Sequence, residues 1–123
     1  MKANAAADGG FTLVELMVVL AIIGVLVTIS VTSYLHYKDQ ANDAVAHANV
    51  HEATVSIESY YADNKTYLGM TLGALHQDYD QALDPSRYVL NGLTADTYCI
   101  SSTVGGQSWR KDGPGQDDEK GSC

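Results

Sequence analysis

An uncharged apolar run near the start of the chain restricts the fold more than any other feature. Residues 16–35 contain no charged side chain, and valine, isoleucine and leucine dominate them. A helix rises about 1.5 Å per residue, so a run of this length spans roughly 30 Å, the hydrocarbon thickness of a bilayer. We therefore predict a helix that crosses a membrane or associates strongly with one.

One carboxylate, Glu15, lies directly before this run, and only Lys2 and Asp8 carry charge on its N-terminal side. An ionised side chain in a membrane is costly and usually has a functional partner, although Glu15 could also reach the membrane interface. A cleaved secretory signal is a competing interpretation, with a weak small-residue site at residues 28–30. Such signals have a shorter apolar core, about 7 to 15 residues, and a basic start.

The stretch GFTLVELMVVLAIIGVLVTIS, residues 10–30, resembles the N-terminal signature of type IV pilins and the related pseudopilins. In that family a prepilin peptidase cuts after the glycine and N-methylates the new first residue. The resemblance therefore implies cleavage after Gly10 and a methylated N terminus at Phe11. It also implies that Glu15 and the Phe11 amine of a neighbouring subunit pair during assembly, because a paired buried carboxylate costs far less than an unpaired one.

Two departures from the family pattern concern this segment. Asp8 stands near the position where leaders often carry a basic residue, which leaves Lys2 to supply the cytoplasmic positive charge. Thr32 stands where many members have a helix-kinking proline; it can bend a helix slightly but keeps its backbone donor. Tyr34 and Tyr37 match tyrosines common in the family, at the depth of an interfacial aromatic belt.

Beyond Tyr37 the helical pattern continues and becomes amphipathic, with two apolar stripes. Two stripes suit a helix that is covered on one side by its own domain and on the other by neighbouring molecules. The pattern ends at Asp63-Asn64, which are helix breakers. The first stripe consists of Ala46, Val50, Ala53, Ile57 and Tyr61, and the second of Ala41, Ala44, Val45, Ala48 and Val55.

The remaining chain predicts a small antiparallel sheet. Strand signals occur at residues 87–93 and 97–104, with Ala95-Asp96 in the turn between them, and more weakly at 107–111. A short helical turn is expected at 72–76, and the polar tail is expected to form turns. The predicted fold class is α+β, with a long N-terminal α-helix whose outer half packs on this sheet, as in a type IV pilin. The predicted organisation is a leader of residues 1–10, a hydrophobic transmembrane and assembly helix of residues 11–37 and a soluble domain of residues 38–123, divided into a helix half (38–62), a loop (63–86) and a sheet with a disulfide-closed tail (87–123).

The only two cysteines are Cys99 and Cys123, and no CxxC spacing supports a zinc ribbon or a thioredoxin-like pair. In an oxidising compartment one disulfide between them is the economical interpretation, and two free thiols are the alternative. In the pilin family two C-terminal cysteines close a surface loop through a disulfide, and the positions of Cys99 and Cys123 match that layout.

The composition and the missing motifs argue against several functions. With 15 acidic and 7 basic residues the net charge is −8, which does not favour nucleic-acid binding. No hydrolase triad, P-loop or dinucleotide fingerprint is present, so we expect neither enzyme activity nor a cofactor. His47 and His51 have a metal-binding spacing, but Ala48 and Val55 replace the other residues of a zinc hydrolase motif, which favours surface or interface histidines. The acidic tail could hold calcium, as the C-terminal loop of major pseudopilins does, but no EF-hand spacing is present, which favours a solvated loop. Its residues are Asp112, Asp117, Asp118 and Glu119.

The resemblance predicts a structural subunit of a type IV pilus or related filament, serving adhesion, motility or DNA uptake. It implies as partners copies of itself, other pilins, a prepilin peptidase, an assembly ATPase and a platform protein. The subunit would reside in the cytoplasmic membrane with its N terminus inside, and later in an extracellular or periplasm-spanning filament. The alternatives are a pseudopilin of a type II secretion system, a minor DNA-uptake pilin and, in another class, a small secreted binding domain with an ordinary signal peptide.

Overall fold

A computed structural model describes residues 12–123. The predicted leader and the predicted processing site, Gly10 and Phe11, lie outside the described residues. The chain divides into two compact units, the first ending at Lys38 and the second running from Asp39 to Cys123. Each unit is described by itself.

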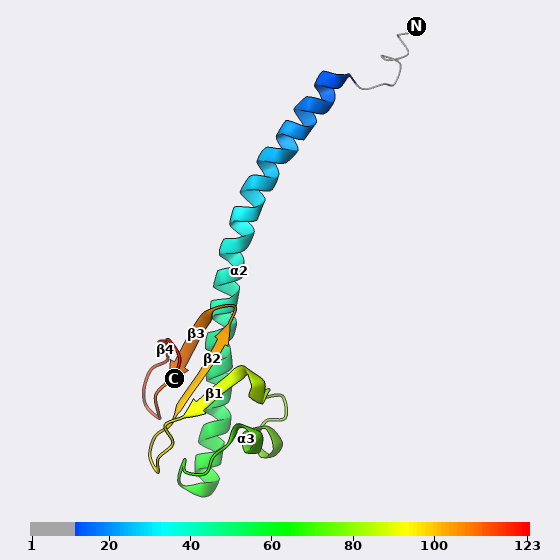
Figure 1. Ribbon diagram of the computed structural model, residues 1–123. Helices are drawn as coiled ribbons and strands as arrows, with labels where there is room; N and C mark the ends of the chain where they lie inside the picture. Colours follow the sequence, from blue (N-terminus) through cyan, green and yellow to red (C-terminus); the bar gives the residue numbers. More distant parts are fainter. Residues whose placement is uncertain (1–11) are drawn as a thin grey trace. The chain divides into compact units, whose positions relative to one another are not determined.

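A single helix, α2 (Leu13–Asn64), contributes to both units (Figure 1). It contains Gly24 and Thr32 without interruption, as expected for a segment that lacks proline. The helix includes Asp63 and Asn64 and so extends two residues beyond its predicted end at residue 62. Lys65 then takes a left-handed conformation with φ 60°, and its N–H bonds back to the carbonyl of Tyr61 at 2.7 Å. This arrangement is a common helix ending.

In the second unit, one face of α2 forms one side of the hydrophobic core. Four residues of the predicted first stripe are completely buried, and Tyr61 is partly buried, which confirms that this stripe faces the domain. The second stripe is exposed throughout. The core is completed by residues from the connecting segment and the sheet: Tyr67, Met70, Leu75, Leu83, Tyr88, Tyr98 and Ile100.

The connection between helix and sheet contains more regular structure than the sequence predicts. Helix α3 (Leu72–Asp78) is two residues longer than the predicted turn, and its N-cap Thr71 accepts a 3.1 Å bond from the N–H of Ala74. Leu75 of α3 is fully buried, so tertiary contacts support the extra residues. A short 3-10 helix, η1 (Pro85–Arg87), leads into the sheet.

Four antiparallel strands form one sheet in the order β1-β2-β3-β4. The third matches its prediction, whereas the first two are shorter than expected. β1 leaves the ladder where Gly92 adopts φ 63°, and β2 begins only after a turn in which the N–H of Thr94 bonds the carbonyl of Thr97 at 3.0 Å. The strands are β1 (Tyr88–Asn91), β2 (Cys99–Val104), β3 (Gln107–Lys111) and β4 (Glu119–Lys120).

The last strand, β4, corrects the prediction that the tail forms only turns. It contains two residues and pairs with Trp109 and Arg110 of β3. Two residues are too few to show an alternating sequence pattern. They form a strand because they pair with β3, not because of their own β propensity.

The sheet packs on the second half of α2 through polar as well as apolar contacts (Figure 1). The amide of Asn49 on α2 donates to the Ser102 hydroxyl of β2 at 3.1 Å, and the Tyr88 hydroxyl donates to the Asn49 carbonyl at 3.1 Å. Asn49, Ser102 and Tyr88 are all buried. The predicted α+β class, with a long N-terminal helix and a small antiparallel sheet, is therefore confirmed.

Candidate functional site

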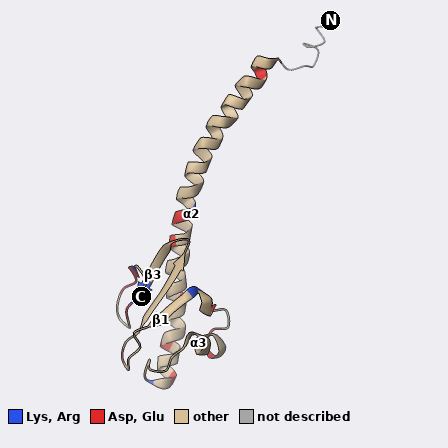
Figure 2. Cartoon of the chain, in the orientation of Figure 1, with Lys and Arg blue, Asp and Glu red and all other residues tan. Residues whose placement is uncertain are grey.

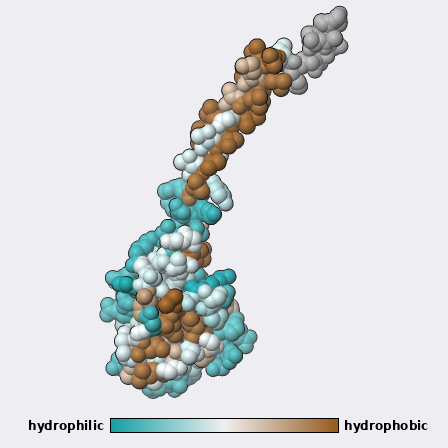
Figure 3. All heavy atoms as spheres, in the orientation of Figure 1, coloured by the Kyte–Doolittle hydropathy of each residue, from teal (hydrophilic) through white to brown (hydrophobic). Residues whose placement is uncertain are grey.

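The first part of α2 presents an apolar surface that nothing in the described chain covers. Every large hydrophobic side chain from Leu13 to Leu35 is between 49% and 75% exposed. Figure 3 shows the resulting continuous hydrophobic surface, and Figure 2 shows how few charged residues it carries. This stretch is long and apolar enough to cross a membrane. Because none of these side chains is buried, the segment differs from the core helix of a soluble protein.

The helix begins with a reciprocal pair of hydrogen bonds between Thr12 and Glu15. The N–H of Glu15 donates to the Thr12 hydroxyl at 3.2 Å, and the N–H of Thr12 donates to the Glu15 carboxylate at 3.4 Å. This is a capping box, in which two backbone donors that the first helical turn leaves free are both satisfied. A negative side chain in the first turn also interacts favourably with the helix dipole.

Glu15 therefore has a hydrogen-bond partner, Thr12, within its own chain. This pair was not among the predictions from the sequence. The signal was visible, because a threonine followed three residues later by glutamate directly before an apolar run is the sequence signature of a capping box. Gly10 and Phe11 lie outside the described residues. The proposed pairing of Glu15 with a neighbouring N terminus remains a prediction.

Three hydroxyl side chains in the middle of this segment bond back to the helix. Thr28 donates to the carbonyl of Gly24 at 2.9 Å, Ser30 to that of Leu26 at 2.8 Å and Thr32 to that of Thr28 at 3.1 Å. These bonds satisfy the hydroxyl groups inside the helix itself, so the polar side chains do not need partners from solvent. These three hydroxyl groups are therefore compatible with an apolar surrounding.

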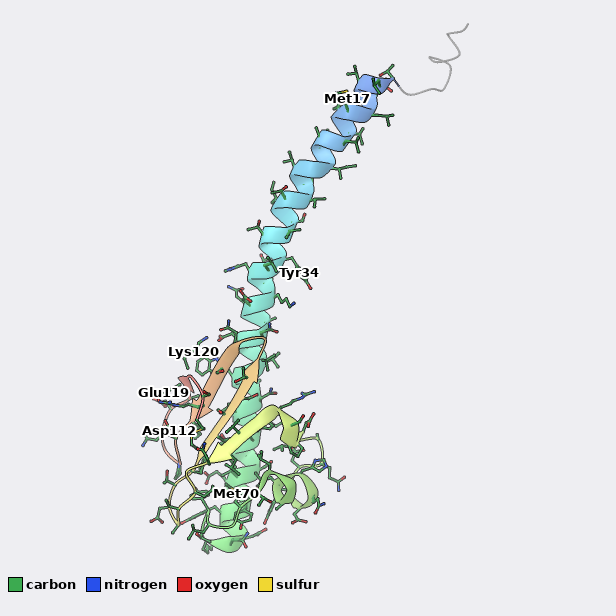
Figure 4. The ribbon with its side chains drawn as sticks, viewed as in Figure 1. Met17, Tyr34, Met70, Asp112, Glu119 and Lys120 are labelled. Carbon is green, nitrogen blue, oxygen red and sulfur yellow. A yellow bond between two sulfur atoms is a disulfide. The ribbon has the colours of Figure 1, made fainter. Side chains whose placement is uncertain are left out.

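A second candidate site is the C-terminal segment, residues 112–123, which returns along the sheet. A disulfide between Cys99 and Cys123, the predicted pair, joins its end to the start of β2. Arg110 of β3 contacts three points of the segment. It lies 3.1 Å from the Asp112 carboxylate and 3.4 Å from that of Glu119, and it donates to the Ser122 carbonyl at 3.3 Å. Asp112, Glu119 and Lys120 lie together beside β3 and β4 (Figure 4).

The neighbouring lysine holds the middle of the C-terminal segment. Lys111 donates to the Gln116 carbonyl at 2.5 Å, and its ammonium lies 3.9 Å from the carboxylate of Asp118. Three of the four tail carboxylates, those of Asp112, Asp118 and Glu119, are thus paired with cations of the chain. The segment is largely exposed, as expected of a solvated acidic loop, and these ion pairs in addition tie it to β3.

Trp109 and His47 connect this segment to α2. The two rings are stacked, with centroids 3.9 Å apart and planes inclined by 6°, and His47 Nε2 lies 2.9 Å from the Asp118 carboxylate. The Trp109 indole N–H donates to Asp43 at 2.9 Å, and Lys120 pairs with the same carboxylate. These bonds from Lys120 and Trp109 hold the pKa of Asp43 below its usual value. Sequence patterns could not reveal this cluster, because its two residues on α2 are separated from the others by more than 60 residues.

A polar network within the core involves Glu58 of α2. Its carboxylate accepts bonds from the Tyr67 hydroxyl at 3.1 Å and the Tyr98 hydroxyl at 3.5 Å. Burial, with the hydrogen bond to Glu58, raises the pKa of Tyr67 to about 12, and burial likewise raises the pKa of Tyr98. The network ties the connecting segment and β2 to α2 and so stabilises the domain.

Within residues 12–123, no group of three or more metal-ligating side chains is placed to hold a metal ion. His47 bonds to Asp118, and His51 is exposed one turn further along α2. The two histidines lie on the surface of the helix, where the sequence analysis placed them.

Known proteins with similar sequences agree with this architecture. Residues 6–31 match the prokaryotic N-terminal methylation motif. The chain is 30% identical to the type IV wide pilus major component PilA4 of Thermus thermophilus over 101 aligned residues. The alignment covers 81% of this chain and 77% of PilA4. The type IV narrow pilus major component PilA5 of the same organism is 45% identical over 53 residues, 43% of this chain and 42% of that protein. The type II secretion system core protein G of Pseudomonas aeruginosa is 36% identical over 60 residues, 49% of this chain and 42% of that protein.

A long helix with an uncovered apolar first part, joined to a small disulfide-bonded α+β unit, defines the class of type IV pilin-like folds. The chain belongs to the type IV pilin family, as its match to PilA4 over most of both sequences shows. The shorter matches lie within the same group of pilins and pseudopilins and span less than half of each relative.

Proposed function

We propose that this protein is the structural subunit of a type IV pilus or a closely related filament. The observation that carries the proposal is the exposed apolar part of α2, which a single chain in water could not leave uncovered without a large free-energy cost. A membrane covers this surface before assembly, and the equivalent helices of neighbouring subunits cover it in the filament. The relatives named as major pilus components support the same role.

The proposed route to the filament begins with processing. A prepilin peptidase removes residues 1–10 and methylates Phe11, in line with the methylation motif at residues 6–31. The subunit is held in the cytoplasmic membrane with its N terminus inside and its domain outside. An assembly ATPase and a platform protein then drive its transfer into a filament of identical subunits and other pilins.

Glu15 selects the assembled state in this proposal. In an isolated subunit its carboxylate bonds the N–H of Thr12 at 3.4 Å, a long bond that leaves its charge unpaired. The amine of a processed Phe11 on a neighbouring subunit offers a full positive charge in an apolar surrounding. Exchanging the local bond for this ion pair lowers the cost of keeping the carboxylate there.

The proposal is tested by sequencing the N terminus of the mature protein and by electron microscopy of filaments. We expect a methylated Phe11 as the first residue, and filaments with the native protein. Glu15→Ala should insert and be processed but should not assemble, whereas the control Thr28→Ala should assemble. A mature N terminus near Val31 would instead support the secreted domain with a signal peptide.

A pseudopilin of a type II secretion system is the second candidate, favoured by the match to core protein G. Both candidates use the same helix and the same processing. Deletion of the gene separates them, because loss of secretion with surface pili unchanged indicates a pseudopilin. Loss of surface pili with secretion unchanged indicates a pilin.

A further inference from the structure

The C-terminal segment is held at its ends and at its middle by different kinds of contact. The disulfide holds one end covalently, and Arg110 holds both Asp112 and the Ser122 carbonyl. The middle depends on Lys111 and His47, which both reach Asp118. Loss of a middle contact would therefore loosen the segment without detaching it.

His47 is the closer of the two partners of Asp118. Its Nε2 lies 2.9 Å from the carboxylate, compared with 3.9 Å for the Lys111 ammonium. Its ring is also stacked on Trp109, which fixes its orientation. The His47 side chain is 46% exposed, so protons reach it freely, whereas the Asp118 side chain is only 17% exposed.

The charged groups around His47 come from α2, β3 and the C-terminal segment. On α2 the neighbours are Asp43 and His51, on β3 Lys111, and on the C-terminal segment Asp118 and Lys120. Asp43 is already paired with Lys120 and bonded by the Trp109 indole. Asp118 is left with a distant lysine and the imidazole, so the charge on His47 determines how strongly Asp118 is held.

We propose that His47 is a proton-controlled latch for the middle of the C-terminal segment. Histidine changes its charge between about pH 5 and pH 8. A protonated His47 forms a charge-assisted hydrogen bond with Asp118 and places a cation over the Trp109 ring, and both interactions weaken when the proton leaves. The middle of the segment is thus held tightly in mildly acidic solution and loosened in mildly alkaline solution, while the disulfide and Arg110 retain its ends. The latch does not depend on filament formation.

The test is amide hydrogen exchange of the full chain in detergent micelles at about pH 5.5 and pH 8, corrected for intrinsic rates. We expect the amide of Gly121, which bonds the Ser108 carbonyl at 2.9 Å three residues beyond Asp118, to lose protection by about two- to fivefold at the higher pH, the range that exposed ion pairs contribute. The single tryptophan, Trp109, provides a second readout, because a stacked imidazolium quenches indole fluorescence more than neutral imidazole does.

Three variants make the result specific. His47→Gln should remove the pH dependence from both readouts, and the matched control His51→Gln on the same helix should preserve it. Asp118→Asn should keep the fluorescence titration but lose the exchange effect, because the ring remains beside Trp109 without its charged partner. The proposal is overturned if protection in the native protein is independent of pH or rises with pH. It is equally overturned if His47→Gln retains the native dependence, or if fluorescence titrates while exchange does not change.

Discussion

The side chain of Asn49 on α2 donates a 3.1 Å hydrogen bond to the hydroxyl of Ser102 on β2, with both groups buried. This bond joins the helix to the sheet across a sequence separation of 53 residues. The Asn49 backbone carbonyl also accepts the Tyr88 hydroxyl. Helix and sheet are therefore fixed in register by polar groups inside an otherwise apolar interface, where an unpaired partner would be costly.

Ser102→Ala should lower the free energy of unfolding by about 1 to 3 kcal/mol, because it leaves the buried Asn49 amide without an acceptor. Denaturant unfolding of the full chain in micelles, followed by Trp109 fluorescence, measures the loss. The control Ser59→Ala removes an exposed hydroxyl that bonds only its own helix. Equal stability of the two variants would contradict the importance of the buried pair.

Stability should decline as the pH rises from about 10 toward 12, since an unfolded tyrosine has its usual pKa near 10. Burial and Glu58 raise the pKa of Tyr67 to about 12, so the folded state keeps a proton that the unfolded state has lost. Below this window both states hold the proton, and the titration of Tyr67 contributes no pH dependence to the stability. Tyrosinate absorbance should show late titration of the buried tyrosines. Glu58→Gln should lower the pKa of Tyr67, and simultaneous titration of all eight tyrosines would contradict the network.

Gly105→Ala should destabilise the domain by about 1 kcal/mol or more, whereas Gly106→Ala should have a smaller effect. Both glycines of the β2–β3 turn have positive φ, 55° and 84°. A Cβ at Gly105 would collide with the Asn42 side chain of α2, while the space beside Gly106 is open. Thermal midpoints of the two variants provide the comparison, and an equal shift would show that the close approach to Asn42 has no energetic consequence.

Replacing Cys99 and Cys123 by serine should lower the stability by about 2 to 5 kcal/mol, the usual cost of removing a native disulfide from a small secreted domain. Arg110 and Lys111 would still hold the C-terminal segment, so we expect a less stable domain with a native-like core. Thermal unfolding with and without a reducing agent tests this. The native protein should lose stability on reduction, and the variant should not respond.

Thr12→Val should unwind the first turn of α2 by removing the hydroxyl that accepts the Glu15 N–H. Loss of a threonine N-cap costs about 1 kcal/mol. Faster amide exchange at Glu15 and Leu16, whose N–H groups bond Thr12, would report the change in micelles, and Thr12→Ser should restore protection because it keeps the capping oxygen. Unchanged exchange in the valine variant would show that the capping box does not define the start of the helix.

The apolar helix, the buried stripe and most of the sheet were predictable, because periodicity and uninterrupted hydrophobicity are local properties of the chain. Ala46, Val50, Ala53 and Ile57 follow the helical repeat and are all buried. The predicted strand at residues 107–111 agrees with β3. Errors occurred at element ends, where Gly92 and Lys65 adopt left-handed conformations that composition does not reveal.

The apolar helix with one carboxylate at its start was predictable from the sequence alone, because its length and lack of charge are local properties of the chain. The α+β class and a disulfide between Cys99 and Cys123 were also predicted, and both are present in the structure. Three features became visible only in the folded chain: the two-residue strand β4, the pairing of the acidic tail with Arg110 and Lys111, and the cluster of His47, Trp109 and Asp118. These contacts join residues far apart in the chain, and single surface charges carry no periodic signal. Their partners were therefore settled by the packing of the sheet on the helix.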